Sequence, residues 1–64
     1  MLSYKPLEKT LIDRETCKSK MCTDLHISPN TQAKFKKGQP VALTVIEKMC
    51  KYLNCRIEDV VEIL

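Results

Sequence analysis

The stretch from Ser28 to Gly38, SPNTQAKFKKG, constrains the fold of this chain most, because it carries both a start and a stop signal for a helix. Ser28 is a good N-cap residue. Pro29 suits the first helical position, because an N–H there would have no partner within the helix. Gly38 fits the left-handed position that follows a helix C-terminus. These signals predict a short helix over residues 29–37.

Apolar spacing predicts four more helices along the chain. They cover about residues 6–14, 18–25, 43–53 and 57–64. Pro6 suits the first turn of the first of these helices, and Leu7 and Leu11 lie one helical turn apart on one face. No strand pattern competes with the helices. The sequence therefore predicts an all-α fold, a compact five-helix bundle, in one domain spanning residues 1–64.

A tight turn separates two of the predicted helices. Only His26 and Ile27 lie between the helix that ends at about residue 25 and the Ser-Pro start of the next. Two short helices joined in this way are typical of a helix-turn-helix. The pattern predicts this unit over about residues 18–37.

Charge is distributed unevenly along the chain. The 20 residues from Lys18 to Lys37 hold five lysines against one acid, Asp24, and residues 38–64 hold three basic and four acidic groups. A basic first half beside a neutral or acidic second half favours a polyanion-binding face and a separate packing face. A solvated lysine-rich surface would produce the same counts, so charge alone leaves both interpretations open.

The four cysteines form two pairs with a C-x4-C spacing, Cys17 with Cys22 and Cys50 with Cys55. The start of the chain lacks the apolar stretch of a signal peptide, so we expect a cytoplasmic protein with reduced thiols. Cys22 and Cys50 fall on apolar helix faces, which favours buried thiols that act as small hydrophobic residues. A four-thiolate zinc site remains an alternative on spacing alone.

Several classes of protein are excluded at this stage. No window approaches 18 consecutive apolar residues, so we expect no membrane-spanning helix. The chain contains no Ser/His/Asp set, no plausible pair of catalytic carboxylates and no glycine-rich phosphate loop. We therefore expect neither an enzyme nor a small-molecule substrate, and no cofactor.

The order of these elements resembles the Cro/phage-repressor (xenobiotic-response-element) helix-turn-helix family, and it is most similar to small stand-alone members. The resemblance covers nearly the whole chain. It rests on ISPNT at residues 27–31, on Lys37–Gly38, and on LNC at residues 53–55 followed by a short final segment. The resemblance implies a bacterial or prophage regulator, a repressor by expectation, whose helix at 29–37 lies in the major groove of double-stranded DNA.

Candidate DNA contacts follow from the resemblance together with helix geometry. Asn30, Lys34 and Lys37 share one outward face, and the resemblance places Asn30, Thr31 and Lys34 at base edges. We expect phosphate contacts from Lys18, Ser19, Lys36 and Lys37. Each residue also has a plain structural explanation: a solvated amide for Asn30, local backbone bonding for Thr31, and lysines that complement the dipole at the helix end.

Three residues depart from the family pattern, and one of them, Thr16, stands where an aliphatic residue is usual. Members usually have Gly at the position of His26, and His is among the residues that tolerate a left-handed backbone, so we interpret His26 as a turn residue. Gln32 stands where an aliphatic residue is usual, and we expect it either to weaken the core or to rotate the helix.

Apolar residues crowd the last predicted helix. A single face cannot cover Val60, Val61, Ile63 and Leu64, so these residues are the candidate interface of a homodimer on a pseudo-palindromic operator. They could equally complete a small core.

Two functions compete with DNA recognition. A degenerate helix-turn-helix could serve as a protein-interaction module, such as an antitoxin or an adaptor. The four cysteines could also serve a thiol redox sensor or a metal sensor.

Overall fold

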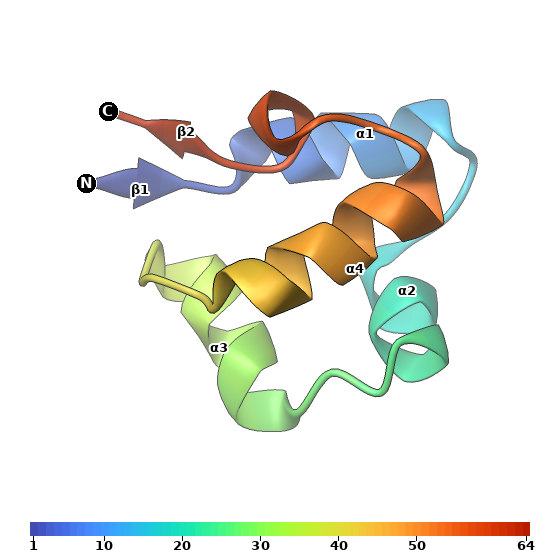
Figure 1. The fold of residues 1–64 in the computed structure, drawn as a ribbon, viewed down its shortest axis with the longest axis horizontal. Helices are drawn as coiled ribbons and strands as arrows, with labels where there is room; N and C mark the ends of the chain where they lie inside the picture. Colours follow the sequence, from blue (N-terminus) through green and yellow to red (C-terminus); the bar gives the residue numbers. More distant parts are fainter.

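A computed structural model describes all 64 residues, and four α-helices dominate it (Figure 1). The α-helices are α1 (Lys5–Asp13), α2 (Lys18–Asp24), α3 (Pro29–Lys37) and α4 (Leu43–Leu53). A 3-10 turn, η1 (Ile57–Asp59), follows them, and two short strands, β1 (Leu2–Ser3) and β2 (Glu62–Ile63), lie at the chain ends. None of the helices has the length and apolar character needed to cross a bilayer.

The prediction of a fifth helix over residues 57–64 is wrong. This segment forms one 3-10 turn and then the strand β2, which pairs antiparallel with β1 in the register Leu2↔Ile63. The β-branched residues Val60, Val61 and Ile63 favour an extended backbone, and Leu2 and Ser3 offer it a strand to pair with. The N–H of Leu64 also donates to the carbonyl of Met1 at 2.8 Å, so the two chain ends lie side by side (Figure 1).

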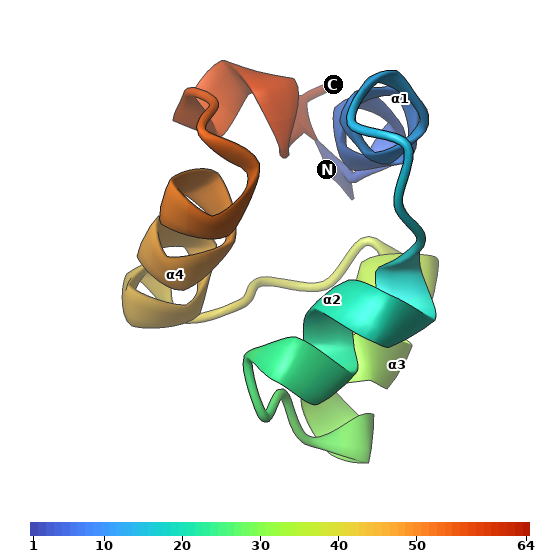
Figure 2. The ribbon, with the colours of Figure 1, turned by 90° about the vertical axis from the view of Figure 1, so that its right-hand side faces the viewer.

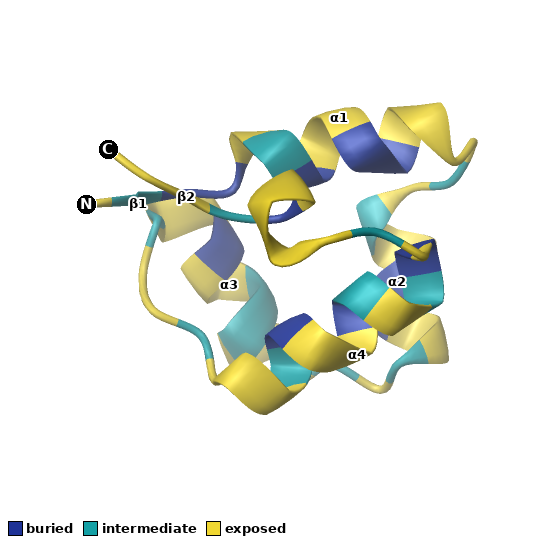
Figure 3. Cartoon of the chain, turned by 45° about the horizontal axis from the view of Figure 1, so that its top comes forward, coloured by how far each residue is buried: buried dark blue, intermediate teal, exposed yellow.

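The core lies where α1, α4 and the helix-turn-helix meet. Figure 2 shows α2 and α3 packed across each other below α1, with α4 on the opposite side. Ten apolar side chains fill the space between them: Tyr4, Leu7, Leu11, Met21, Cys22, Phe35, Ile46, Met49, Leu53 and Val60. In Figure 3 the outer faces of α1, α3 and η1 are mostly exposed, as expected for helices that bury a single stripe.

All four helices end in the same way, with one residue in the left-handed conformation. These residues are Glu15, His26, Gly38 and Asn54, with φ between 52° and 67°. After each of them, the next N–H donates to a carbonyl five residues earlier, at 2.9–3.0 Å. This is the 6→1 bond of a Schellman cap, which satisfies a carbonyl that the helix leaves free. The turn role predicted for His26 is confirmed.

Only one of these caps requires glycine for space. A Cβ added at Gly38 would lie 2.6 Å from the carbonyl oxygen of Leu2, closer than any side chain tolerates. The chain end therefore packs directly on the C-terminus of α3. Tyr4 strengthens this junction, because its hydroxyl donates to the carbonyl of Gln39 at 2.7 Å and its ring meets Phe35 edge to face at 5.1 Å.

Candidate nucleic-acid interface

Helix α3 has defined ends because the residues that flank it satisfy its free backbone groups. The Ser28 hydroxyl accepts from the N–H of Thr31 at 3.3 Å, and Gly38 takes the left-handed cap. Phe35 is the one buried residue of the helix and anchors it to the core. The helix is thereby held on one side only, and its other side faces solvent.

The predicted base-reading side chains do not share one environment. Asn30 and Lys34 are exposed, lie one turn apart and bind no other side chain of this protein. Thr31 is half-buried, and its hydroxyl lies 3.1 Å from that of Ser28 within the N-cap. The hydroxyl of Thr31 thus has a local partner, which leaves Asn30 and Lys34 as the free polar groups on the outward face of α3.

The one acid of the helix-turn-helix is drawn away from α3. The carboxylate of Asp24 lies 3.9 Å from the amine of Lys20 and accepts a 2.5 Å hydrogen bond from the hydroxyl of Tyr52 on α4. This bond, first among several causes, raises the pKa of Tyr52, because ionisation would place two negative charges side by side. Lys34, Lys36 and Lys37 form no ion pair, so their charge is not neutralised within the chain.

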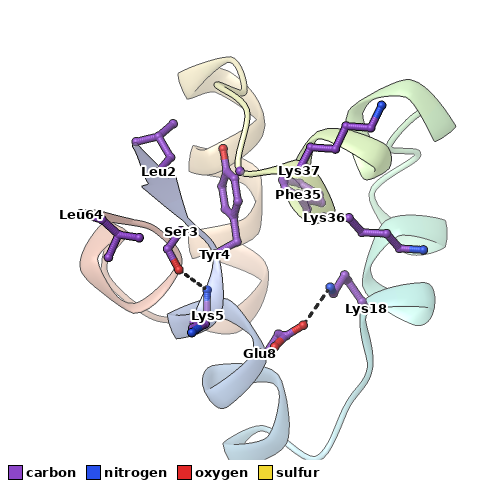
Figure 4. Close-up of a pocket in the computed structure, with 11 residues that line it drawn as sticks. Leu2, Ser3, Tyr4, Lys5, Glu8, Lys18, Phe35, Lys36, Lys37 and Leu64 are labelled. Carbon is purple, nitrogen blue, oxygen red and sulfur yellow. Dashed lines mark hydrogen bonds and ion pairs between the residues drawn. The ribbon is translucent and has the colours of Figure 1, made fainter.

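Three of the four predicted phosphate contacts border a single pocket, and the fourth lies next to it. The pocket has a volume of about 440 Å³ and lies between the start of α1, the start of α2 and the end of α3 (Figure 4). Lys18, Lys36 and Lys37 line it. Ser19 is exposed and follows Lys18 in the first turn of α2.

Lys18 is the one of these lysines with a partner. Its amine lies 3.3 Å from a carboxylate oxygen of Glu8, and Figure 4 shows the two side chains pointing toward each other. Since Glu8 remains 62% exposed and Lys18 30% exposed, water competes for both groups and the pair is weak. An incoming phosphate can therefore replace Glu8 as the partner of Lys18.

Lys5 also lines this pocket, and sequence reasoning missed it. Its only local signal was a positive charge just before Pro6. The chain start that carries Lys5 borders this pocket because Leu2 packs on Gly38, which is a contact between residues 36 apart in the sequence. Spacing within one helix cannot reveal such a neighbour.

Gln32 does not weaken the core. Its side-chain amide donates to the carbonyl of Ile27 at 2.9 Å, and its side chain is half-buried. The amide therefore bonds a backbone group of the turn between α2 and α3. This bond gives the polar residue a structural role at a position where the family usually has an aliphatic one.

The predicted dimer residues divide into two groups. Val60 has no exposed surface and lies in the core, and Val61 is half-buried, so the core interpretation holds for these two positions. Ile63 and Leu64 are 83% and 72% exposed, and Met1 beside them is 90% exposed. We call these three residues the terminal patch.

Comparisons with known proteins agree with this geometry. The sequence model of the Cro/C1-type helix-turn-helix DNA-binding domain matches residues 6–63. A crystal structure of the transcriptional regulator VanUg (Form II) superposes with a TM-score of 0.93 at 41% sequence identity. That similarity covers 98% of this chain and 84% of the other. No curated protein sequence matches the chain.

Proposed function

Because the chain belongs to the Cro/C1-type helix-turn-helix DNA-binding family, we propose that it is a sequence-specific transcriptional regulator that inserts α3 into the major groove of operator DNA. The observation that carries the proposal is the exposed pair Asn30 and Lys34 on a helix capped at both ends. The similarity to a protein described as a transcriptional regulator supports the regulatory role.

The spacing of the two side chains fits the spacing of base pairs. Four residues of helix rise about 6 Å, and stacked base pairs lie about 3.4 Å apart, so Asn30 and Lys34 can reach base pairs roughly two steps apart. Asn bonds the N6/N7 edge of adenine, and Lys bonds O6 or N7 of guanine. Thr31 adds a methyl group for thymine, since its hydroxyl is engaged by Ser28.

Lysines around the pocket supply the phosphate contacts in this proposal. Lys18 with Ser19 holds the backbone on one side of α3, and Lys36 with Lys37 holds it on the other. We add Lys5, whose side chain borders the same pocket. These contacts fix the register of the protein on DNA without reading its sequence.

We also propose that two copies bind as a homodimer through the terminal patch and repress by occupying the operator. The molecule measures 27 × 22 × 18 Å, so two copies side by side can present two recognition helices about 34 Å apart, one turn of DNA. The terminal patch lies near the C-terminus of α3, because Leu2 packs on Gly38. This arrangement requires a pseudo-palindromic operator.

The decisive experiment selects bound sequences from random duplex DNA. We expect the wild-type chain to return a shared pseudo-palindromic motif. Asn30→Ala and Lys34→Ala should each relax one position in both half-sites, at a cost of about 1–3 kcal/mol per base contact. Lys48→Ala, which removes an exposed lysine on α4, is the matched control and should leave the motif unchanged.

The opposite outcome has a clear meaning. Selection that returns no shared motif would contradict the regulator and favour a protein-interaction module, whose contact surface would be the terminal patch. In that case Ile63→Ser would abolish partner binding while Asn30→Ala would leave it intact.

Salt dependence tests the phosphate contacts separately. Substitution of Lys18, Lys36 or Lys37 by Ala should lower the slope of log affinity against log salt by about one unit each, since each contact releases about one counterion. Lys5→Ala should do the same, and Lys48→Ala should not. If all five variants have the same slope as the wild type, the pocket lysines do not contact the DNA backbone.

A further inference from the structure

The two cysteine pairs share one spacing but have different surroundings. Cys17 is exposed and precedes α2, whereas Cys22 is 2% exposed and belongs to the core. Residues five apart on a continuous helix point about 140° away from each other, so these two thiols diverge. Cys50 and Cys55 are both half-buried, and the end of α4 lies between them.

The cap of α4 brings Cys50 and Cys55 together. Asn54 takes the left-handed conformation with φ of 52°, and the chain turns back on the helix. The N–H of Cys55 then donates directly to the carbonyl of Cys50 at 3.0 Å. In a Schellman cap, these two positions are the ones whose side chains contact each other. The contact pair of this cap is therefore a pair of thiols.

The surroundings hold this cap in place. The Nε atom of Arg14 on α1 donates to the carbonyl of Leu53 at 2.8 Å, and its Nη2 atom lies 3.3 Å from the carbonyl of Asn54. The carboxylate of Asp59 in η1 accepts from the N–H of Arg56, the residue after Cys55, at 3.2 Å. A guanidinium on one side and a carboxylate on the other fix the backbone around the pair.

We infer that Cys50 and Cys55 form a modification site, at which a two-electron oxidant of the peroxide class converts the thiol pair to an intramolecular disulfide. One thiolate attacks a peroxide oxygen, the O–O bond breaks, and a sulfenic acid forms while the leaving hydroxide takes up the proton that the thiol released and becomes water. The second thiol attacks that sulfur and displaces the second water. Two S–H bonds are lost, one S–S bond forms, and hydrogen peroxide accepts the two electrons.

The pKa values of the two thiols control the rate of this oxidation. Burial raises the pKa of both thiols, and the carboxylate of Asp59 raises both further. Arg14 acts in the opposite direction, lowering the pKa of Cys55. Because the thiolate is the nucleophile, oxidation should be slow at neutral pH and accelerate as pH rises toward 9.

The test uses the full chain carrying Cys17→Ser, which removes the exposed thiol and leaves three. After treatment with hydrogen peroxide, the remaining thiols are alkylated in denaturant and the products are weighed and mapped. We expect loss of two thiols and the mass of two hydrogens, with a Cys50–Cys55 link in a single chain. The matched variants C17S/C50S and C17S/C55S should form no intrachain disulfide.

Three outcomes would overturn the inference. A disulfide that includes Cys22 would show that exposure of the core thiol is faster than formation of the Cys50–Cys55 bond. Conversion of Cys50 and Cys55 to sulfinic or sulfonic acids without a link would show that their sulfurs cannot meet. A rate that stays flat from about pH 7 to about pH 9 would exclude the thiolate route. None of these outcomes depends on DNA binding, so they neither support nor contradict the proposed regulator function.

Discussion

The helix-turn-helix at residues 18–37 and the paired chain ends at residues 1–3 and 57–64 are organised by different kinds of contact. In the first, each turn and cap is fixed by residues within a few positions of each other, such as Ser28 with Thr31. In the second, Leu2 pairs with Ile63 across nearly the whole chain. Local chemistry thus shapes the helix-turn-helix, whereas the chain ends depend on the rest of the fold.

The two regions meet at Gly38. The cap of α3 belongs to the helix-turn-helix, and the carbonyl of Leu2 that packs on it belongs to the chain ends. This contact brings Lys5 to the same pocket that Lys36 and Lys37 line. Substitutions on either side of it show how far the regions depend on each other.

We expect the largest effect from Gly38→Ala. A left-handed backbone costs a residue with a side chain about 1–2 kcal/mol, and displacement of Leu2 adds a similar amount, so the chain should lose about 3 kcal/mol of unfolding free energy. Urea denaturation measures this loss. Glu15→Ala is the matched control at an exposed left-handed cap and should change stability little. A loss of only about 1–2 kcal/mol in Gly38→Ala, the left-handed cost alone, would contradict the close approach of Leu2.

The next largest effect on stability is expected at Val60, and Ile63 in the same segment serves as its comparison. Val60→Ala removes two methyl groups from a fully buried side chain and should cost about 2 kcal/mol. Ile63→Ala changes a residue that is 83% exposed and should leave the stability of the monomer nearly unchanged. In the proposed dimer, however, Ile63→Ala should weaken self-association, which sedimentation measures. A monomer destabilised equally by both changes would mean that Ile63 is part of the core.

A gain of stability is expected from His26→Gly. Glycine avoids the cost of about 1–2 kcal/mol for a left-handed side chain but loses about 0.5–1 kcal/mol of backbone entropy, which leaves a net gain of about 0.5 kcal/mol. Thermal unfolding should show a slightly higher midpoint. A loss instead would indicate that the imidazole makes a stabilising contact in the turn.

The smallest effect is confined to alkaline solution and concerns Tyr4 at the junction. Burial raises the pKa of Tyr4 above its ordinary 10.0, so the folded chain retains a proton that the unfolded chain loses. Stability is therefore fully present below pH 10 and falls as pH rises through the folded pKa. Tyr4→Phe should show a shallower decline above pH 10. An identical decline in both proteins would place the titrating group elsewhere.

The sequence predicted α3 and α4 with the observed boundaries, and α1 and α2 within one residue, because capping and apolar spacing are local signals. It failed at residues 57–64. There the apolar spacing suits a helix, but pairing with Leu2 and Ser3 decides the outcome. The same limit applies to the site: Asn30 and Lys34 follow from helix periodicity, whereas Lys5 joins the lysines only through the packing at Gly38.

The hydrogen bond between the N–H of Leu64 and the carbonyl of Met1 makes the protein a natural candidate for circular permutation. A short glycine linker between these ends, with new termini cut at the Pro40–Val41 peptide, whose backbone groups form no hydrogen bond, would turn the most distant pairing in the chain into a local hairpin. The entropy of closing that loop would no longer oppose folding, so the permuted chain should fold faster.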